Sequence, residues 1–98
     1  MRKISEEIAR AFYEGRVKRM SNTHTDGHSI YLHGNEIARK LEGVTGRTLA
    51  VSVTLAGWNT NTTRDRLNAL EGVKVNTKQG QAFLNGEKWE GGWIAIKA

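Results

Sequence analysis

The sequence predicts an α+β fold, in which a mostly antiparallel sheet carries an N-terminal amphipathic helix and a short central helix. Apolar residues recur at helical spacing near the N-terminus, and they alternate with small or polar residues over Thr48–Ala56. Glycine-bearing turns separate short strand-like runs in the second half of the chain. Because 98 residues have room for one core rather than two, we expect residues 1–98 to form a single domain.

The N-terminal helix is predicted over residues 1–20, with Ser5–Met20 as its clearest part and with Gly15 as a point where it could stop or bend. Its apolar stripe consists of Ile4, Ile8, Ala11 and Phe12. Ser5 is placed to cap the free amides of the first turn. Residues 21–27 are polar and offer nothing to a core, so we interpret them as a flexible linker to a β-rich core at 28–98.

Three strands are expected between the two helices. Ser29–His33 and Glu36–Leu41 form a hairpin around Gly34-Asn35, because both turn residues tolerate the positive φ angles of a tight turn. Thr48–Ala56 is the clearest strand, since apolar and small or polar residues alternate along it. This alternation predicts a sheet that is covered on one face.

The second helix is expected near residues 62–71, where Thr62 and Asp65 resemble a capping box. The rest of the chain is strand and turn. Val73–Thr77 pairs with Gln81–Leu84, a tight turn at Asn85-Gly86 leads into Glu87–Trp89, and Trp93–Lys97 ends the chain. The expected order of elements is α-β-β-β-α-β-β-β.

Composition restricts the function classes. The absence of cysteine excludes a disulfide framework and a thiolate metal site, and it fits a reducing compartment. No apolar run approaches the roughly 20 residues that cross a bilayer, so we expect no membrane partner. The net charge of +5 and the sequence pI of about 9.9 favour a polyanionic partner.

No catalytic motif is recognised in the sequence. It holds no nucleophile elbow, and its glycines fit neither a phosphate-binding loop nor a dinucleotide fold. The candidate metal ligands are His24, His28 and His33, with Asp26 among them, but their spacing matches no zinc motif. We therefore expect no enzyme activity, no cofactor and no metal.

The segment that begins at Trp58 is the first candidate binding site. A helix N-terminus presents free amides that hold an anion, and a tryptophan beside it stacks on a base or packs beneath the loop. The alternative is a well-capped helix with solvated arginines. The candidate residues are Trp58, Asn59, Thr60, Asn61, Arg64 and Arg66.

The basic end of the first helix is the second candidate site, because clustered cations attract phosphates. Its residues are Arg16, Lys18 and Arg19. A third candidate is the pair Trp89 and Trp93 beside Gly91-Gly92. Whether these two tryptophans build the core or an interface is left open, as is the case for Trp58.

Several segments resemble a family of small uncharacterised proteins encoded by tailed bacteriophages. They are Tyr31–Ala38 (YLHGNEIA), Ala56–Leu70 (AGWNTNTTRDRLNAL), Gly72-Val73 and Phe83–Trp89 (FLNGEKW), with a similar start at Ala9–Tyr13 and Ser21–Thr23. The resemblance covers most of the chain. It implies a phage origin and the cytoplasm of a bacterial host as the location. The family comes with no established activity, so no catalytic residue is carried over.

Two functions remain in competition. The first is a non-enzymatic phage accessory protein that binds a host protein, as host-takeover and anti-defence proteins do. The second is a nucleic-acid-binding accessory protein that contacts phosphates through a basic face. Self-association is left open, because a flexible linker at 21–27 would permit exchange of the first helix between copies.

Overall fold

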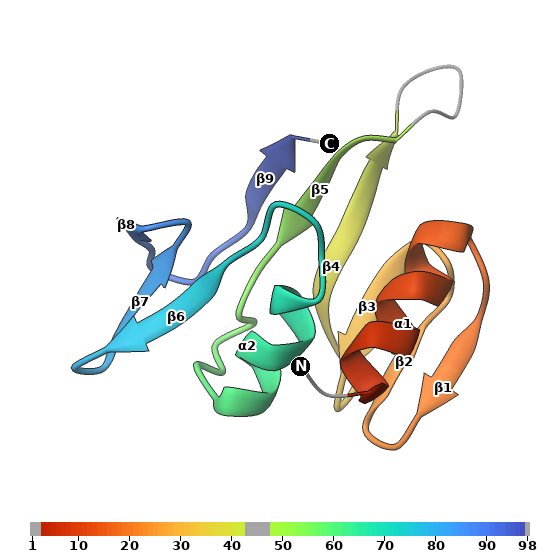
Figure 1. Ribbon diagram of the computed structural model, residues 1–98, viewed down its shortest axis with the longest axis horizontal. Helices are drawn as coiled ribbons and strands as arrows, with labels where there is room; N and C mark the ends of the chain where they lie inside the picture. The colour runs from red at the N-terminus through yellow and green to blue at the C-terminus, as the bar shows by residue number, and fades with distance from the viewer. Residues whose placement is uncertain (1–2, 43–47, 98) are drawn as a thin grey trace.

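The computed structural model describes residues 3–42 and 48–97, and Figure 1 traces their path. The helices are α1 (Lys3–Glu14) and α2 (Asn61–Asn68). The strands before α2 are β1 (Lys18–Met20), β2 (Thr23–Thr25), β3 (Ser29–Leu32), β4 (Asn35–Glu42) and β5 (Thr48–Val53). Those after it are β6 (Val75–Lys78), β7 (Gln81–Leu84), β8 (Glu87–Lys88) and β9 (Ile94–Lys97). The α+β class is confirmed, but the described part of the chain has five strands before α2 rather than three.

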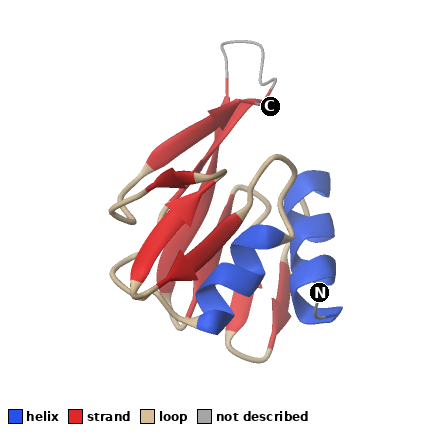
Figure 2. Ribbon diagram, turned by 60° about the vertical axis from the view of Figure 1, so that its left-hand side comes forward, coloured by secondary structure: helices blue, strands red, loops and turns tan. Residues whose placement is uncertain are grey.

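The described strands form two sheets, and every neighbouring pair is antiparallel. The larger sheet has six strands in the order β1-β2-β3-β4-β5-β9, so the last strand of the chain lies beside β5. The smaller sheet has three strands in the order β6-β7-β8. Figure 2 shows both helices on the same side of the six-stranded sheet.

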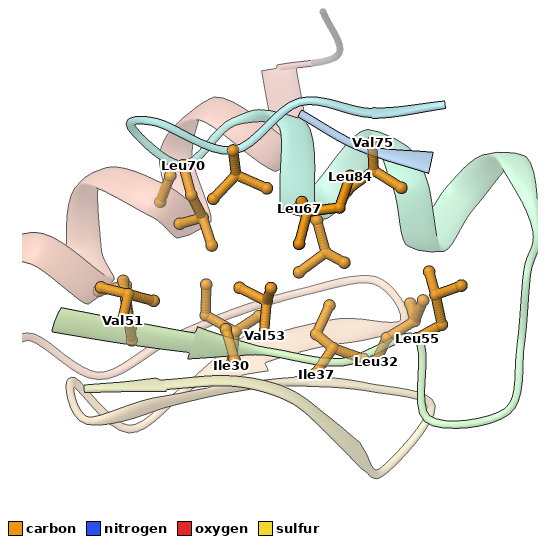
Figure 3. Packing of buried hydrophobic residues seen from close by; sticks show 14 of the residues in the cluster. Ile30, Leu32, Ile37, Val51, Val53, Leu55, Leu67, Leu70, Val75 and Leu84 are labelled. Carbon is orange, nitrogen blue, oxygen red and sulfur yellow. The ribbon is translucent and has the colours of Figure 1, made fainter. Parts of the chain in front are cut away.

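The hydrophobic core lies between the six-stranded sheet and a second layer, which contains both helices and the three-stranded sheet (Figure 3). Phe12 of α1, Leu67 of α2 and Val53 of β5 are all 0% exposed. Val75 and Leu84 join them from the three-stranded sheet. Each such side chain contributes roughly 1.5–3 kcal/mol through its burial, so this interface fixes the position of both helices.

The alternation along Thr48–Ala56 buries apolar residues as predicted, as far as their side chains are described. Its buried apolar residues are Val51, Val53 and Leu55, while the side chain of Leu49 lies outside the described part. Thr54 is also buried, because its hydroxyl donates to the main-chain oxygen of Gly91 at 2.7 Å. The segment before β9 therefore covers part of the face that was expected to meet solvent.

The first helix ends at Glu14, so the predicted range of 1–20 is too long and the alternative stop at Gly15 is the one observed. Gly15 adopts a left-handed φ of 71° and donates its N–H to the Phe12 oxygen, while Arg16 donates to the Ala11 oxygen at 2.8 Å. These two bonds form a Schellman cap, which stops the helix. The basic residues that follow were predicted to continue it, but Lys18 and Arg19 instead lie on β1.

Residues 21–27, predicted as a flexible linker, instead belong to a β hairpin. Thr23 and Thr25 of β2 are 1% and 0% exposed, and the Thr25 hydroxyl donates to the Ser29 main-chain oxygen at 2.6 Å. A Cβ on Gly27 would lie 2.6 Å from the carbonyl atoms of Gly15, so the turn between β2 and β3 packs closely on the end of α1. These two threonines belong to a segment that was expected to be polar and outside the core. They are buried because their hydroxyls are hydrogen-bonded within the protein.

One tight turn was predicted at the right place and one was displaced. Asn85-Gly86 has positive φ angles of 52° and 86°, as a two-residue turn between β7 and β8 requires. The β3–β4 turn was expected at Gly34-Asn35 but is formed by His33 and Gly34, because Asn35 already pairs with Leu32.

Candidate functional site

A hollow of about 490 Å³ lies between the β3–β4 turn, the β5–α2 connection and the first turn of α2. Its apolar lining consists of Leu32, Ile37, Leu55 and Trp58, and its polar lining consists of His33, Asn35, Thr60, Thr62 and Thr63. We call it the Trp58 hollow. Its size falls within the roughly 300–1,000 Å³ of ligand-binding pockets.

The Trp58 side chain is 59% exposed, although it borders an apolar hollow. It follows a tight turn in which Ala56 and Gly57 have φ angles of 53° and 84°, and its N–H donates to the Leu55 oxygen at 2.8 Å. Positive φ at both central positions is the pattern of a type I′ turn. The turn therefore places Trp58 three residues after the buried Leu55, at the edge of the hollow.

The first turn of α2 forms another wall of the hollow. Its N-cap is Thr60, whose hydroxyl accepts the N–H of Thr63 at 3.2 Å and contacts the Thr63 hydroxyl at 3.0 Å. The capping box predicted from Thr62 and Asp65 is wrong, because the cap lies two residues earlier and Asp65 is bonded elsewhere. Thr60 and Thr63 are therefore engaged with each other at the helix start.

Arg64 is bound to its own loop. Its guanidinium donates to the side-chain oxygens of Asn59 and Asn61, and the Asn59 amide in turn donates to the Thr77 hydroxyl at 3.3 Å. The sequence identified all three residues as donors for an outside anion. In the structure they connect the β5–α2 loop, the first turn of α2 and the strand β6.

Arg66 lies inside the protein, with 4% of its surface exposed. Its Nε donates to the Thr23 hydroxyl at 2.9 Å, and its Nη1 donates to the Ser5 hydroxyl at 2.8 Å and the Asp65 carboxylate at 3.2 Å. Nη2 lies 3.4 Å from the Asn22 side-chain oxygen. We call this group the Arg66 network. It joins α2 to α1 and to the β1–β2 hairpin, so the prediction that Arg66 contacts an external phosphate is wrong.

Ser5 takes part in the same network and not in a cap. It lies within α1 and is 1% exposed, and its hydroxyl donates to the Asp65 carboxylate at 2.5 Å. The sequence assigned it to the helix start because serine is common at N-caps.

The basic residues after the first helix do not form a helical face. Arg16 follows the end of α1 and pairs with Glu14 at 2.6 Å, while Lys18 on β1 lies 4.0 Å from Glu7. Arg19 is exposed on β1, an edge strand of the six-stranded sheet. Figure 1 shows β1 on the far side of the molecule from the β5–α2 loop. The candidate cations are thus divided between separate regions.

Sequence reasoning missed the β3–β4 side of the hollow. Leu32, Asn35 and Ile37 were assigned to the hairpin alone, and Leu55 to the core alone. The sequence places this hairpin and the α2 start far apart, so no local pattern joins them. All the lining residues except Leu55 lie in the segments Tyr31–Ala38 and Ala56–Leu70. Both segments resemble the same family, and this shared resemblance was the sequence signal that could have linked the two sides of the hollow.

His33 is the ionisable side chain that lines the Trp58 hollow in the described structure. Its Nε2 lies 3.5 Å from the Asn22 amide, and the hollow brings no second acid or base to it. Two side chains elsewhere have shifted pKa values. Burial raises the pKa of Tyr13, whereas hydrogen bonds from the main chain of Ser29 and His28 lower the pKa of Asp26. The described lining of the hollow thus combines an apolar part with His33 and a few uncharged polar side chains.

Residues 3–42 and 48–97 contain neither a cluster of metal ligands nor a helix that could span a membrane. No three side chains of His, Cys, Asp or Glu converge there in a way that would hold an ion. Neither α1, with 12 residues, nor α2, with 8, is long and apolar enough to cross a bilayer.

The other two tryptophans differ in burial. Trp89 is 7% exposed and its indole N–H donates to the Gly92 oxygen at 2.9 Å, so it belongs to the core. Trp93 is 44% exposed and lies against the Arg39 guanidinium, whose carbon is 4.0 Å from the ring centre. The two tryptophans thus differ in place: Trp89 is in the core and Trp93 lies at the surface.

Comparison with known proteins gives a family and no closer relative. Searches of curated proteins and of solved structures found no match. Residues 1–95 match the protein family described as Kyanoviridae Gp96 protein. The match spans nearly the whole chain and confirms the expected likeness to a small phage protein family without a known function. The chain therefore belongs to the Kyanoviridae Gp96 family of phage proteins.

Proposed function

We propose that this phage protein is a non-enzymatic accessory protein that binds a host protein, and that the Trp58 hollow receives an apolar side chain of that partner. The partner would meet it in the cytoplasm of the bacterial host. The observation that carries the proposal is an exposed tryptophan beside an apolar hollow of about 490 Å³.

An exposed tryptophan of this kind has a plain energetic meaning. Leaving a large aromatic surface in water is unfavourable, and covering it with a partner recovers roughly 25 cal/mol for each Å² removed from water. Tryptophan is also among the residues that most often dominate the binding energy of protein interfaces. The buried neighbours Leu55 and Ile37 are 4% and 1% exposed, which gives Trp58 a rigid apolar floor beside it.

The polar groups around the hollow favour a protein partner over a phosphate. Arg64 of α2 is a candidate cation, and it already donates to two asparagine side chains. Thr60 and Thr63 are bonded to each other, so their mutual hydrogen bond leaves at most one of the two hydroxyl protons for an anion. His33, Asn35 and Thr62 remain as a polar rim, as is usual around the apolar centre of a protein interface.

Site-specific photo-crosslinking tests this proposal. A photoreactive amino acid replaces Thr62 at the edge of the hollow, and the full-length protein is produced in infected or host cells. The same amino acid replaces Val17 as the control, because Val17 is 78% exposed and lies between α1 and β1. We expect a host protein to crosslink reproducibly from position 62 and not from position 17.

Substitution of Trp58 gives the second arm of the experiment. Trp58→Ala should reduce the crosslink from position 62 by about tenfold or more, since interface hot spots cost about 2 kcal/mol or more on truncation. Trp58→Phe keeps an apolar ring and should retain part of the signal. The proposal fails if position 62 captures no host protein, if positions 17 and 62 capture the same one, or if Trp58→Ala leaves the yield unchanged.

A further inference from the structure

The six-stranded sheet has a second face, opposite the core. The helices and the three-stranded sheet pack against the core-facing side of the six-stranded sheet, where Ile30, Leu32 and Val53 are buried (Figure 3). Side chains alternate along a strand, so Tyr31, between Ile30 and Leu32, points to the opposite face. In the described structure that face carries aromatic rings and cations from several strands.

The first row of this face crosses four strands. Arg19 of β1 pairs with His24 of β2, His24 pairs with Tyr31 of β3, and Tyr31 pairs with Glu36 of β4. Directly paired residues in antiparallel strands share a face. The rings of His24 and Tyr31 stack, with centres 4.7 Å apart and planes inclined by 11°. Both rings remain partly exposed, and Arg19 is exposed beside them.

The second row holds a tryptophan and an arginine. Arg39 of β4 pairs with Ser29 on one side and Ser52 on the other, and its guanidinium lies against the exposed ring of Trp93. The Nη2 atom of Arg39 is 3.1 Å from one carboxylate oxygen of Glu36. The other oxygen of the same carboxylate accepts a hydrogen bond from the Ser29 hydroxyl at 2.6 Å. This carboxylate orients Arg39, and the outer part of the guanidinium remains open because the Arg39 side chain is 42% exposed.

We propose that this face binds single-stranded nucleic acid. Trp93 has one ring face on Arg39 and leaves the other for a base, His24 and Tyr31 stack on each other and offer the outer surfaces of that pair, and Arg19 and Arg39 supply two cations for phosphates. We call these five residues the ring platform. Aromatic rings spread over an open sheet with cations between them suit unpaired bases, because every base has a π face to stack and each phosphate releases counterions. The net charge of +5 has the sign that this ligand requires.

This inference is independent of the Trp58 hollow, since it uses other residues on another surface. It also differs from the sequence-based nucleic-acid hypothesis, which relied on Arg64 and Arg66. Those side chains are bonded within the protein, whereas the ring platform depends on cross-strand register that no linear motif displays. The platform has two cations and not a dense basic patch, so stacking must provide much of the affinity.

Fluorescence anisotropy with a labelled oligothymidylate of about twelve nucleotides tests the ring platform. The full-length protein is titrated at low salt against this strand and against a duplex of the same length. A protein that binds by charge alone favours the duplex, which has the higher charge density. We expect the single strand to bind more tightly, because bases stacked within a duplex cannot lie on the rings.

Variants of the platform provide the second readout. Trp93→Ala should weaken binding of the single strand by about fivefold or more, Trp93→Phe should restore part of the loss, and Arg19→Ala should lower the salt slope by about 0.7. Val17→Ala is the matched control, because Val17 is exposed and outside the platform. Circular dichroism confirms that each variant is folded. Absence of binding at low salt, a preference for the duplex, or full affinity in Trp93→Ala would overturn the proposal.

Discussion

The Trp58 hollow borders the first turn of α2, and the Arg66 network starts one turn further along the same short helix. The two regions reverse the usual places of charged and aromatic residues. Arg66 is 4% exposed, whereas Trp58 is 59% exposed. Arg66 is tolerated inside because Ser5, Thr23 and Asp65 all receive its N–H groups. Trp58 stays outside because no described segment of the chain covers it. Burial in this protein therefore follows the availability of partners rather than residue type.

The difference separates what stabilises the fold from what is free to bind. The network joins α1, α2 and the β1–β2 hairpin, three elements that have no shared sequence signal. The hollow adds little to these contacts, since its exposed tryptophan could be removed without opening the core. Substitutions in the two regions should consequently change different measurements.

Arg66→Ala should have the largest effect on stability. It leaves the Asp65 carboxylate and the Ser5 and Thr23 hydroxyls without their shared donor, and breaking a buried ion pair costs about 3–5 kcal/mol. Urea unfolding followed by circular dichroism measures the loss. Arg64→Ala is the matched control and should change the unfolding free energy by less than about 1 kcal/mol, because the partners of Arg64 are exposed. Equal stability of the two variants would contradict the role of the network.

Gly27→Ala should destabilise the protein by about 2 kcal/mol. Gly27 has a φ of 88°, and an added Cβ would lie 2.6 Å from the carbonyl atoms of Gly15, so the hairpin and the end of α1 must separate. Gly86→Ala is the control, because its φ of 86° is as unfavourable but nothing lies within 4 Å of the added atom. If Gly27→Ala costs no more than Gly86→Ala, residues 21–27 behave as the flexible linker that the sequence predicted.

These two tests concern the region where sequence reasoning failed most. The hairpin β3–β4, the alternation in β5 and the Asn85-Gly86 turn were predictable, because each depends on residues close together in the chain. The end of α1 at Gly15 was one of two alternatives, and the longer helix was also expected because Lys18 and Arg19 suit a helix terminus.

The buried polar residues were missed for a different reason. From the sequence, Thr23 and Arg66 were expected at the surface. Both are buried because they bond to each other, and they come from β2 and α2, which are far apart in the chain. The candidate site was also predicted only in part. Trp58 and Thr60 were identified from the local capping pattern, whereas Leu32 and Ile37 reach the hollow only through the tertiary fold.

Asp26 should give a smaller effect that depends on pH. Its carboxylate accepts the N–H groups of Ser29 at 2.8 Å and His28 at 2.9 Å, and these bonds hold its pKa below the ordinary 3.8. A lowered folded-state pKa means that the stabilisation is complete above that ordinary value and is lost as the pH falls through the lowered pKa. Because Asp26 is exposed, we expect less than about 1 kcal/mol.

The measurement for Asp26 compares the wild type with Asp26→Asn by urea unfolding at neutral and at strongly acidic pH. The wild type should be the more stable protein at neutral pH, and the difference should shrink in acid, where both side chains are uncharged. A constant difference across this range would show that the charge of Asp26 does not contribute.

The most direct test of the division between fold and binding is Trp58→Ala, measured for both properties in one preparation. We expect its unfolding free energy to stay within about 0.5 kcal/mol of the wild type, as for a surface substitution. At the same time its capture of the host protein by the photoreactive group at position 62 should fall by about tenfold or more. A loss of stability as large as that of Arg66→Ala, or an unchanged capture yield, would contradict the account.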